Sequence, residues 1–214
     1  MRSYAGAIKM TCTVHGPRPL PRSASFSPNL MLLTHVKHAP FASQQGMGHV
    51  RDPIQKDLNY HLETALRGAV TEKRWPKSCI YVTVTIIECN QNGHDDNSIG
   101  TGIWYSMDIL GCCITVASAA LADAGVNCVD MVVGGVAALV CATPSSPPTV
   151  VLDPGPSHRN CIIAACCVAY LPSRNEVTNM WLKGQPHIGD EFYGLVQNAI
   201  QAAGGITRSL WLPS

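Results

Sequence analysis

The chain has 214 residues and a formal net charge of +1 at pH 7. That length is long for one domain but short for two, and no stretch is typical of a hinge between two folding units. Charged residues make up 14 %, against about 25 % in an average protein. So small a charged share fits a protein that buries much of its surface against partners, but composition alone slightly favours a compact enzyme with a large core. A near-neutral chain has no overall field that would recruit nucleic acid, so any RNA contact has to be local.

The ten cysteines predict neither a disulfide framework nor a zinc site. Most lie in runs of Ile, Val, Ala and Leu, where a free Cys packs as a small hydrophobe, and no C-x-x-C pair occurs. Residues 1–4 lack the apolar segment of a signal peptide, so we expect reduced thiols in the cytosol or nucleus. Because the ligand spacing of a metal site is missing, no metal is expected, and no cofactor is expected either. The apolar runs 109–122 and 131–142 are shorter than the roughly 20 residues of a membrane span, and we expect both to be core elements.

The first half of the chain predicts two strands, a helix and a third strand. Strands are expected over residues 8–14, ended by a turn at 15–18, and over residues 30–36. Asp52-Pro53 is a good helix start, because Asp accepts hydrogen bonds from free amides and Pro is tolerated at the first helical position. Apolar residues recur at helical spacing from there to about Val70. The run 79–89 is the clearest strand, and a polar loop follows at 90–98.

The second half predicts a buried helix, three strands and a last helix. The helix covers residues 107–124 and ends at Gly125. Gly204-Gly205 is expected to end the last helix. The mixed order favours an α+β fold over a strictly parallel repeat. We expect one domain, with an N-terminal hairpin region (1–50), the remainder of the core (51–206) and a tail (207–214). The expected strands are 129–140, 149–152 and 161–171, and the last helix is 189–203.

Six short motifs follow one another along the chain. Singly each motif is weak, but in this order they resemble the motifs of the ribonuclease PH family, a family of 3′ exoribonucleases. The resemblance implies a ribonuclease PH-like two-layer α+β sandwich. It also implies a domain that is short at its N-terminus, because relatives have an Arg-x-Asp-Gly-Arg segment and a strand before the first motif. The motifs are 9–18 (KMTCTVHGPR), 38–42 (HAPFA), 75–78 (WPKS), 119–125 (AALADAG), 129–131 (VDM) and 152–154 (LDP).

Within this family, residues 151–184 are most similar to the ring subunit of the eukaryotic RNA exosome that is of the mRNA-transport-regulator type. The resemblance implies a hetero-oligomeric ring with other ribonuclease PH-like subunits, cap subunits on that ring, and RNA in its central channel. It further implies a role in RNA degradation and in the processing of RNA, including rRNA, in the nucleus, nucleolus and cytoplasm, and no membrane.

The phosphate-binding turn of active relatives corresponds to residues 92–103. Phosphorolysis needs backbone amides and Arg side chains that hold phosphate. Thr101 follows a glycine here, as in relatives, but the expected Arg is absent. Asp95 and Asp96 would repel phosphate if they lay in the pocket; a solvated loop is our preferred interpretation of both. The phosphate half of the site is therefore expected to be degenerate.

The carboxylate half of the site is also incomplete. Asp153 matches the first carboxylate of the family, and the second is expected about six residues later by the resemblance, where the chain has Ser157, His158, Arg159 and Asn160. One carboxylate does not make a metal pair. Thr101, Asp153 and His158 are thus degenerate phosphate or metal positions, and no catalytic residue is predicted. The end of a strand, with Pro154 after it, is our preferred interpretation of Asp153.

Arg18 and Arg22 are the candidates for contact with RNA. Both follow the first strand, and the planar guanidinium group fits two phosphate oxygens at once. An exposed loop or a contact with another subunit is the alternative.

Three hypotheses stay open on the sequence alone. We favour a non-catalytic structural subunit of the exosome ring, an inactive member of a phosphorolytic family. The alternative is an active phosphate-dependent 3′-to-5′ exoribonuclease. An unrelated α+β enzyme acting on a small molecule is opposed only by the order of the motifs.

Overall fold

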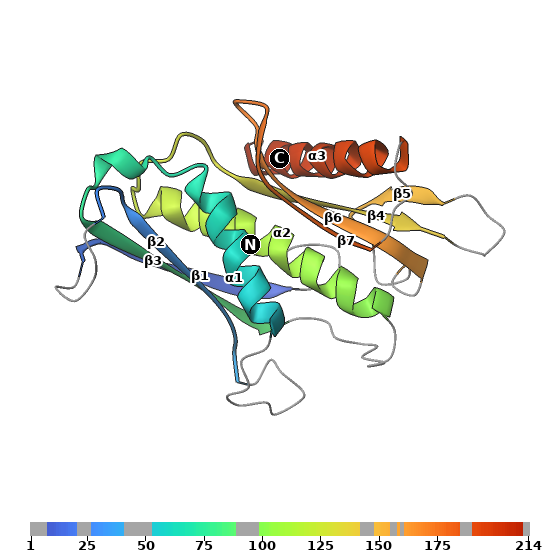
Figure 1. The fold of residues 1–214 in the computed structure, drawn as a ribbon, viewed down its shortest axis with the longest axis horizontal. Helices are drawn as coiled ribbons and strands as arrows, with labels where there is room; N and C mark the ends of the chain where they lie inside the picture. The colour runs from blue at the N-terminus through green and yellow to red at the C-terminus, as the bar shows by residue number, and fades with distance from the viewer. Residues whose placement is uncertain are drawn as a thin grey trace.

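In the part of the chain that the structure describes, two β-sheets and three α-helices stack in alternating layers (Figure 1). The computed structural model describes residues 8–20, 27–40, 53–88, 99–141, 148–154, 158, 161–184 and 190–211. Helices α1 (Pro53–Arg67) and α2 (Ile99–Asp123) lie between a three-stranded and a four-stranded sheet. Helix α3 (Asp190–Trp211) covers the other face of the four-stranded sheet. The α+β class is confirmed. The stack has four layers instead of the two expected, because apolar side chains face both ways from the middle helices.

The three-stranded sheet has the order β1-β3-β2. Strand β3 (Ser78–Glu88) is central, antiparallel to β1 (Lys9–Pro19) and parallel to β2 (Met31–His38). Strands β1 and β2 do not pair with each other, so the hairpin expected in residues 1–50 is wrong. The sequence could not show this, because the partner strand lies beyond the first helix.

Strand β1 continues through the segment predicted to be a turn. The register of β1 against β3 shifts between His15 and Arg18, so the Gly16-Pro17 step forms an irregularity inside the strand and does not end it. Gly16 has φ +135°, and a Cβ there would lie 2.7 Å from the carbonyl oxygen of Cys79. Glycine at this position therefore permits β1 to stay paired with β3 to its end.

The four-stranded sheet is antiparallel, with the order β5-β4-β6-β7. Strands β4 (Val133–Val140), β5 (Thr149–Leu152) and β6 (Ile162–Leu171) confirm the three predicted strands, although β4 begins four residues late. The Asp130 carboxylate accepts hydrogen bonds from the amides of Met131 and Ser173 (both 2.8 Å), which makes the segment before β4 a turn. Strand β7 (Glu176–Gly184) was not predicted, because this edge strand mixes polar and apolar residues without regular alternation.

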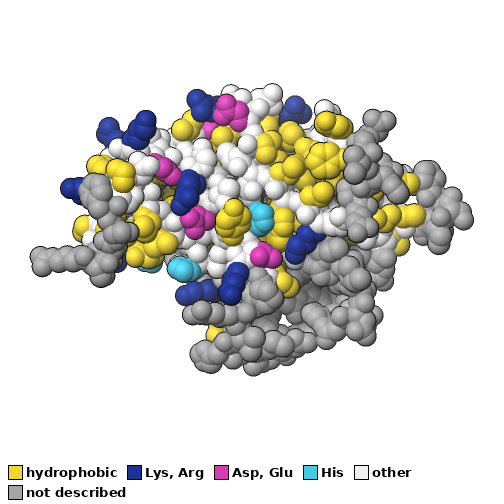
Figure 2. All heavy atoms as spheres, in the orientation of Figure 1, with side chains coloured by type: hydrophobic (Ala, Val, Ile, Leu, Met, Phe, Trp, Pro, Cys, Tyr) yellow, Lys and Arg dark blue, Asp and Glu magenta, His cyan; other side chains and the backbone are white. Residues whose placement is uncertain are grey.

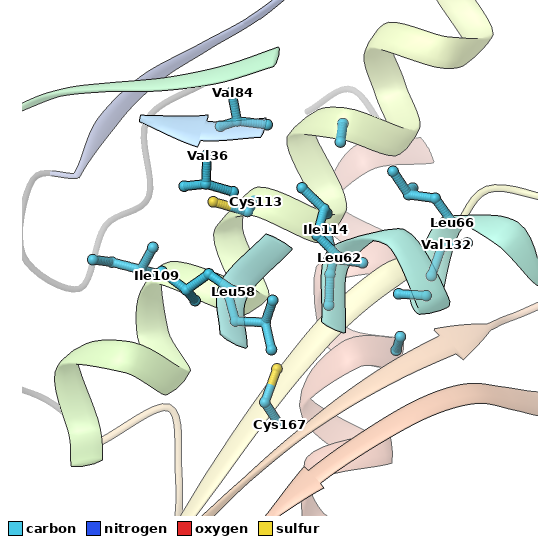
Figure 3. Packing of buried hydrophobic residues seen from close by; sticks show 14 of the residues in the cluster. Val36, Leu58, Leu62, Leu66, Val84, Ile109, Cys113, Ile114, Val132 and Cys167 are labelled. Atoms are coloured by element: carbon cyan, nitrogen blue, oxygen red, sulfur yellow. The ribbon is translucent and has the colours of Figure 1, made fainter. Parts of the chain in front are cut away.

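The two middle helices share one core with both sheets. Leu58, Leu62 and Leu66 of α1 are fully buried at helical spacing, and the backbone amide of Val36 in β2 donates to Asn59 Oδ1 of α1 at 2.6 Å. Cys113 from α2 and Cys167 from β6 are part of the same packing (Figure 3), as predicted for cysteines in apolar runs.

Two adjacent glycines let helices approach β4 from both faces. A Cβ on Gly134 would meet the backbone of α2, at 2.7 Å from the Cα of Gly111. A Cβ on Gly135 would meet α3, at 2.6 Å from the amide of Ala203. The hydroxyl of Thr115 accepts from the amide of Gly134 (3.1 Å) and donates to the carbonyl of Gly111 (3.1 Å). Backbone contact between layers replaces side-chain packing at this point.

Helices α2 and α3 are both longer than predicted. Helix α2 begins at Ile99 and not at Met107. Helix α3 runs through Gly204 and Gly205, so the tail expected from residue 207 is wrong for its helical part. Neither glycine has the positive φ that ends helices, and apolar residues of α3 hold the helix against β4 and β6.

One segment of α2 is long and apolar enough to cross a membrane. This window, Ser106–Asp123, is 67 % buried inside the fold. Its side chains pack against strands of both sheets, which agrees with the predicted core element.

The glycine contact gives a stability prediction. Gly134→Ala is expected to lower the free energy of unfolding by about 2–3 kcal/mol, because neither backbone can move without opening the core. Gly194→Ala is the matched control. It adds the same methyl group to helix α3, where nothing lies within 4 Å, and it should stabilise by about 0.5–1 kcal/mol. Urea unfolding of both variants measures the difference; equal effects would contradict the close-contact interpretation.

Candidate functional site

The positions that correspond to a phosphate pocket lie around the start of α2. The helix begins at Ile99, so Thr101 lies in its first turn, where backbone amides have no partner within the helix. The side chain of Thr101, and Asp95 and Asp96 in the preceding segment, lie outside what the structure describes. Residues 78–158 contain no Lys or Arg at all. Strand β3, helix α2 and strands β4 and β5 therefore supply no cationic side chain to a phosphate group.

Asp153 follows directly on β5, at the end of an edge strand. Its backbone has φ +42°, and its amide donates to the carbonyl oxygen of Val136 in β4 at 3.1 Å. The residue is exposed as a whole, yet partial burial of its carboxyl raises the pKa above the ordinary value of 3.8. Asp tolerates this left-handed conformation better than most residues. The geometry agrees with the interpretation of Asp153 as the end of a strand.

His158 is half-buried in the segment between β5 and β6, and its neighbour Arg159 lies outside the described residues. Within the described ranges, no group of three or more His, Cys, Asp and Glu side chains could hold a metal ion. Asp153 therefore has no metal-binding set around it in that part of the chain.

Arg18 is exposed near the end of β1, and Arg22 lies outside the described residues. Arg18 pairs with Cys79 of β3, two residues from Tyr81 on the same strand. The pKa of Tyr81 is raised, chiefly by a hydrogen bond with Cys79, and the positive charge of Arg18 opposes that shift. The structure thus places Arg18 in the sheet and not in a loop. This position differs from the one expected, and it brings Arg18 close to an aromatic ring.

The buried thiols are chemically quiet. Burial raises the pKa of Cys12 to about 11 and the pKa values of Cys113 and Cys167 well above the ordinary value. Thiolates are the reactive and metal-binding form of cysteine. These three residues consequently act as packing groups at neutral pH.

An aromatic cluster between α1 and β7 was missed by the sequence analysis. The ring of His61 stacks on Trp181 with centroids 4.4 Å apart, and the Lys183 ammonium lies 4.4 Å from the centroid of the indole. Tyr60 contacts His61 edge-on at 5.4 Å and is 68 % exposed. The sequence shows His61 without a spaced partner on its helix, because the partners come from β7, more than a hundred residues later.

Charge and burial in the aromatic cluster favour contact with a protein. Burial lowers the pKa of His61, with a hydrogen bond from Asn179 opposing the shift. The ring is therefore neutral at neutral pH. Acidic, basic and apolar side chains alternate on this face of the molecule (Figure 2). Mixed charge around exposed aromatic side chains is typical of protein interfaces.

Comparison with known proteins identifies the family. The model of the ribonuclease PH domain, described as "3′ exoribonuclease family, domain 1", matches residues 4–127. The chain belongs to the 3′ exoribonuclease family. A crystal structure of Rrp46 from rice (Oryza sativa), another protein with this fold, superposes with a TM-score of 0.71 at 15 % identity, covering 94 % of this chain and 81 % of that chain. The ribonuclease PH-like fold is confirmed.

Relatives within the family share most of the chain. The chain is 51 % identical over 210 residues to "Exosome complex component MTR3" of Chaetomium thermophilum, covering 97 % of this chain and 74 % of that protein. It is 30 % identical to "Exosome complex component MTR3" of Homo sapiens, covering 85 % of this chain and 64 % of the human protein. It is 28 % identical to "Exosome complex component mtr3" of Schizosaccharomyces pombe, covering 83 % of this chain and 62 % of the S. pombe protein. The chain thus spans just under two thirds of the human and S. pombe proteins.

Asp153 offers a direct test of the structural interpretation. Because the folded-state pKa is raised, the folded protein binds this proton more tightly, and stability falls as pH rises through that pKa. Asp153→Asn should therefore stabilise slightly at neutral pH, by less than about 1 kcal/mol since the residue is exposed. It should also remove a part of the stability loss between pH 3.8 and neutrality. Thermal melts at several pH values measure both effects; marked destabilisation would contradict the interpretation.

Proposed function

We propose that this chain is a non-catalytic structural subunit of the RNA exosome ring. The observation that carries the proposal is the 51 % identity to an exosome component over 97 % of the chain. In this role the chain supports 3′-to-5′ processing and degradation of RNA, including rRNA, by holding its neighbours in place. Its partners are other ribonuclease PH-like subunits in the ring and cap subunits on it, with RNA in the central channel. Its location is the nucleus, nucleolus and cytoplasm.

The absence of cations along residues 78–158 supports the catalytic silence. Phosphorolysis requires an enclosed phosphate, and a phosphate has to be held by Arg or Lys as well as by backbone amides. Asp153 stands without a second carboxylate in the following residues 154–160. The chain thus lacks cations for phosphate binding along residues 78–158 and a second carboxylate after Asp153, although it has the fold of the family.

Strand β7 is the surface that best fits a ring neighbour. It is an edge strand, so one side of its backbone has no partner within the four-stranded sheet. Val177 and Met180 on β7 are 44 % and 43 % exposed. Met180 stands on the α3 side of the sheet, and Trp181 of the aromatic cluster stands on the opposite, α1 side of the same edge strand. An edge strand with exposed apolar side chains can pair with a strand of the neighbouring subunit.

The test of catalytic silence is a phosphorolysis assay. The chain, alone and assembled with its ring neighbours, should release no nucleoside diphosphate from single-stranded RNA in phosphate buffer with magnesium. Asp153→Ala should leave the products of an assembled complex unchanged. Release of diphosphates that Asp153→Ala abolishes would establish the alternative, an active exoribonuclease.

The test of the ring contact is co-purification. Met180→Lys should weaken the binding of ring neighbours at least about tenfold, since it places a charge in an apolar interface. Stability should change by no more than about 0.5 kcal/mol, because the side chain is exposed. Tyr193→Lys on α3, where the side chain is 70 % exposed, is the control. Equal binding by both variants would move the contact away from β7.

A further inference from the structure

The two sheets differ in how many faces are covered. The four-stranded sheet is covered by α1 and α2 on one face and by α3 on the other. The three-stranded sheet packs its apolar face on α1 and α2. Its opposite face carries Thr11, Thr13, His15, His35 and Lys37, all of which are exposed. We call this second face of the three-stranded sheet the open sheet face.

The register of the strands arranges the open sheet face in rows. Lys37 of β2, Thr85 of β3 and Thr11 of β1 lie side by side across the sheet. Two residues along, His35, Thr83 and Thr13 form the next row. Side chains in such rows stand on the same side of the sheet, with about 4.8 Å between neighbouring strands. Each of these two rows thus carries one basic side chain, Lys37 or His35, beside two threonine hydroxyls.

The third row of the open sheet face carries an aromatic ring. Tyr81 of β3 lies between His15 of β1 and Leu33 of β2. Arg18 of β1 pairs with Cys79, two residues from Tyr81 along β3, so the side chains of Arg18 and Tyr81 stand on the same face of the sheet. A partly exposed aromatic ring beside a cation is the combination that binds a stacked base and the phosphate next to it.

The charge of the three strands is one-sided. They contain Lys9, Arg18 and Lys37 but one carboxylate, Glu88. Lys9 forms an ion pair with Glu88, which leaves the charges of Arg18 and Lys37 unbalanced within the strands. The α1–β7 side of the molecule, in contrast, mixes both signs of charge with apolar side chains (Figure 2). The two surfaces therefore suit different partners.

We propose that the open sheet face binds single-stranded RNA, with Arg18 and Lys37 on phosphates, the hydroxyls of Thr11 and Thr85 as further donors, and Tyr81 stacking on a base. Charge complementarity carries this assignment, because RNA is a flexible polyanion whose bases can stack on an exposed ring. The proposal rests on the exosome role and adds to it a contact outside any catalytic pocket. An acidic protein segment is the competing occupant.

The first experiment titrates a fluorescein-labelled oligouridylate with the full chain, alone and in its assembled complex. Lys37→Glu and Arg18→Glu should each reduce the salt dependence of binding by about 0.7 in the log–log slope, the value for one phosphate contact on a single strand. Lys56→Glu reverses the same charge on α1, on the covered side of the sheet, and should leave the slope unchanged. The proposal would be overturned if Lys37→Glu and Arg18→Glu had the same slope as Lys56→Glu.

Two substitutions of Tyr81 test whether its aromatic ring contributes to RNA binding. Tyr81→Ala should weaken RNA binding about fivefold or more, the lower end of the loss for one stacked base. Tyr81→Phe keeps the ring and should bind as the unaltered chain does. Equal loss in both variants would overturn the stacking role.

Cross-linking with a 4-thiouridine-substituted oligonucleotide locates the contact within an assembled ring. Cross-links are expected in peptides from β1, β2 and β3, and Lys37→Glu should reduce them. Assembly of the unaltered chain with its neighbours, scored in the same preparations, tests the proposed function separately. Normal assembly without cross-links in these strands would overturn the RNA proposal alone. Loss of a partner protein in Lys37→Glu, with RNA binding unchanged, would assign the face to that protein.

Discussion

The contact between the backbones of α2 and β4 is the constraint on which the rest of the structure depends. Gly111 and Gly134 remove the side chains that would hold these elements apart, and the hydroxyls of Thr115 and Ser118 satisfy the amides of Gly134 and Val132 at the start of β4. Polar groups buried this deeply have to be paired. With α2 seated on β4, its other side is free to pack on the three-stranded sheet, and α1 fills the remaining space.

The same strand extends the stack outward. The face of β4 at Gly135 is turned away from α2, and the missing side chain there lets the backbone of α3 contact the strand. Two consecutive glycines therefore allow close packing of two different layers on β4. The groups that hold the layers together are glycines, buried hydroxyls and apolar side chains, and none of them takes part in holding a phosphate. The fold of this chain therefore does not depend on the residues of a catalytic site. The two described surfaces, the α1–β7 side and the open sheet face, differ in charge.

Several features of the site could be predicted from sequence and others could not. The lack of an Arg before α2 and the solitary carboxylate at Asp153 are matters of residue identity, so sequence reasoning found them directly. The pairing of His61 with Trp181 and the nearness of Arg18 to Tyr81 arise between elements far apart in the chain. Local spacing carries no signal of such contacts, which is why His61 had no evident partner and Arg18 was expected in a loop.

The sequence by itself determined the α+β class and the existence of most elements, because apolar periodicity and β-branched runs express local preferences. The positions of β2, β3, α1 and β6 follow from those preferences. Only the tertiary structure decided the four layers, the path of β1 through Gly16-Pro17, the edge strand β7 and the continuation of α3 through Gly204-Gly205. The last three of these features depend on contacts with distant elements. Strand β1 pairs with β3, strand β7 packs against α1, and helix α3 packs against β4 and β6. Packing against a distant element outweighed the local turn and helix-end preferences in these places.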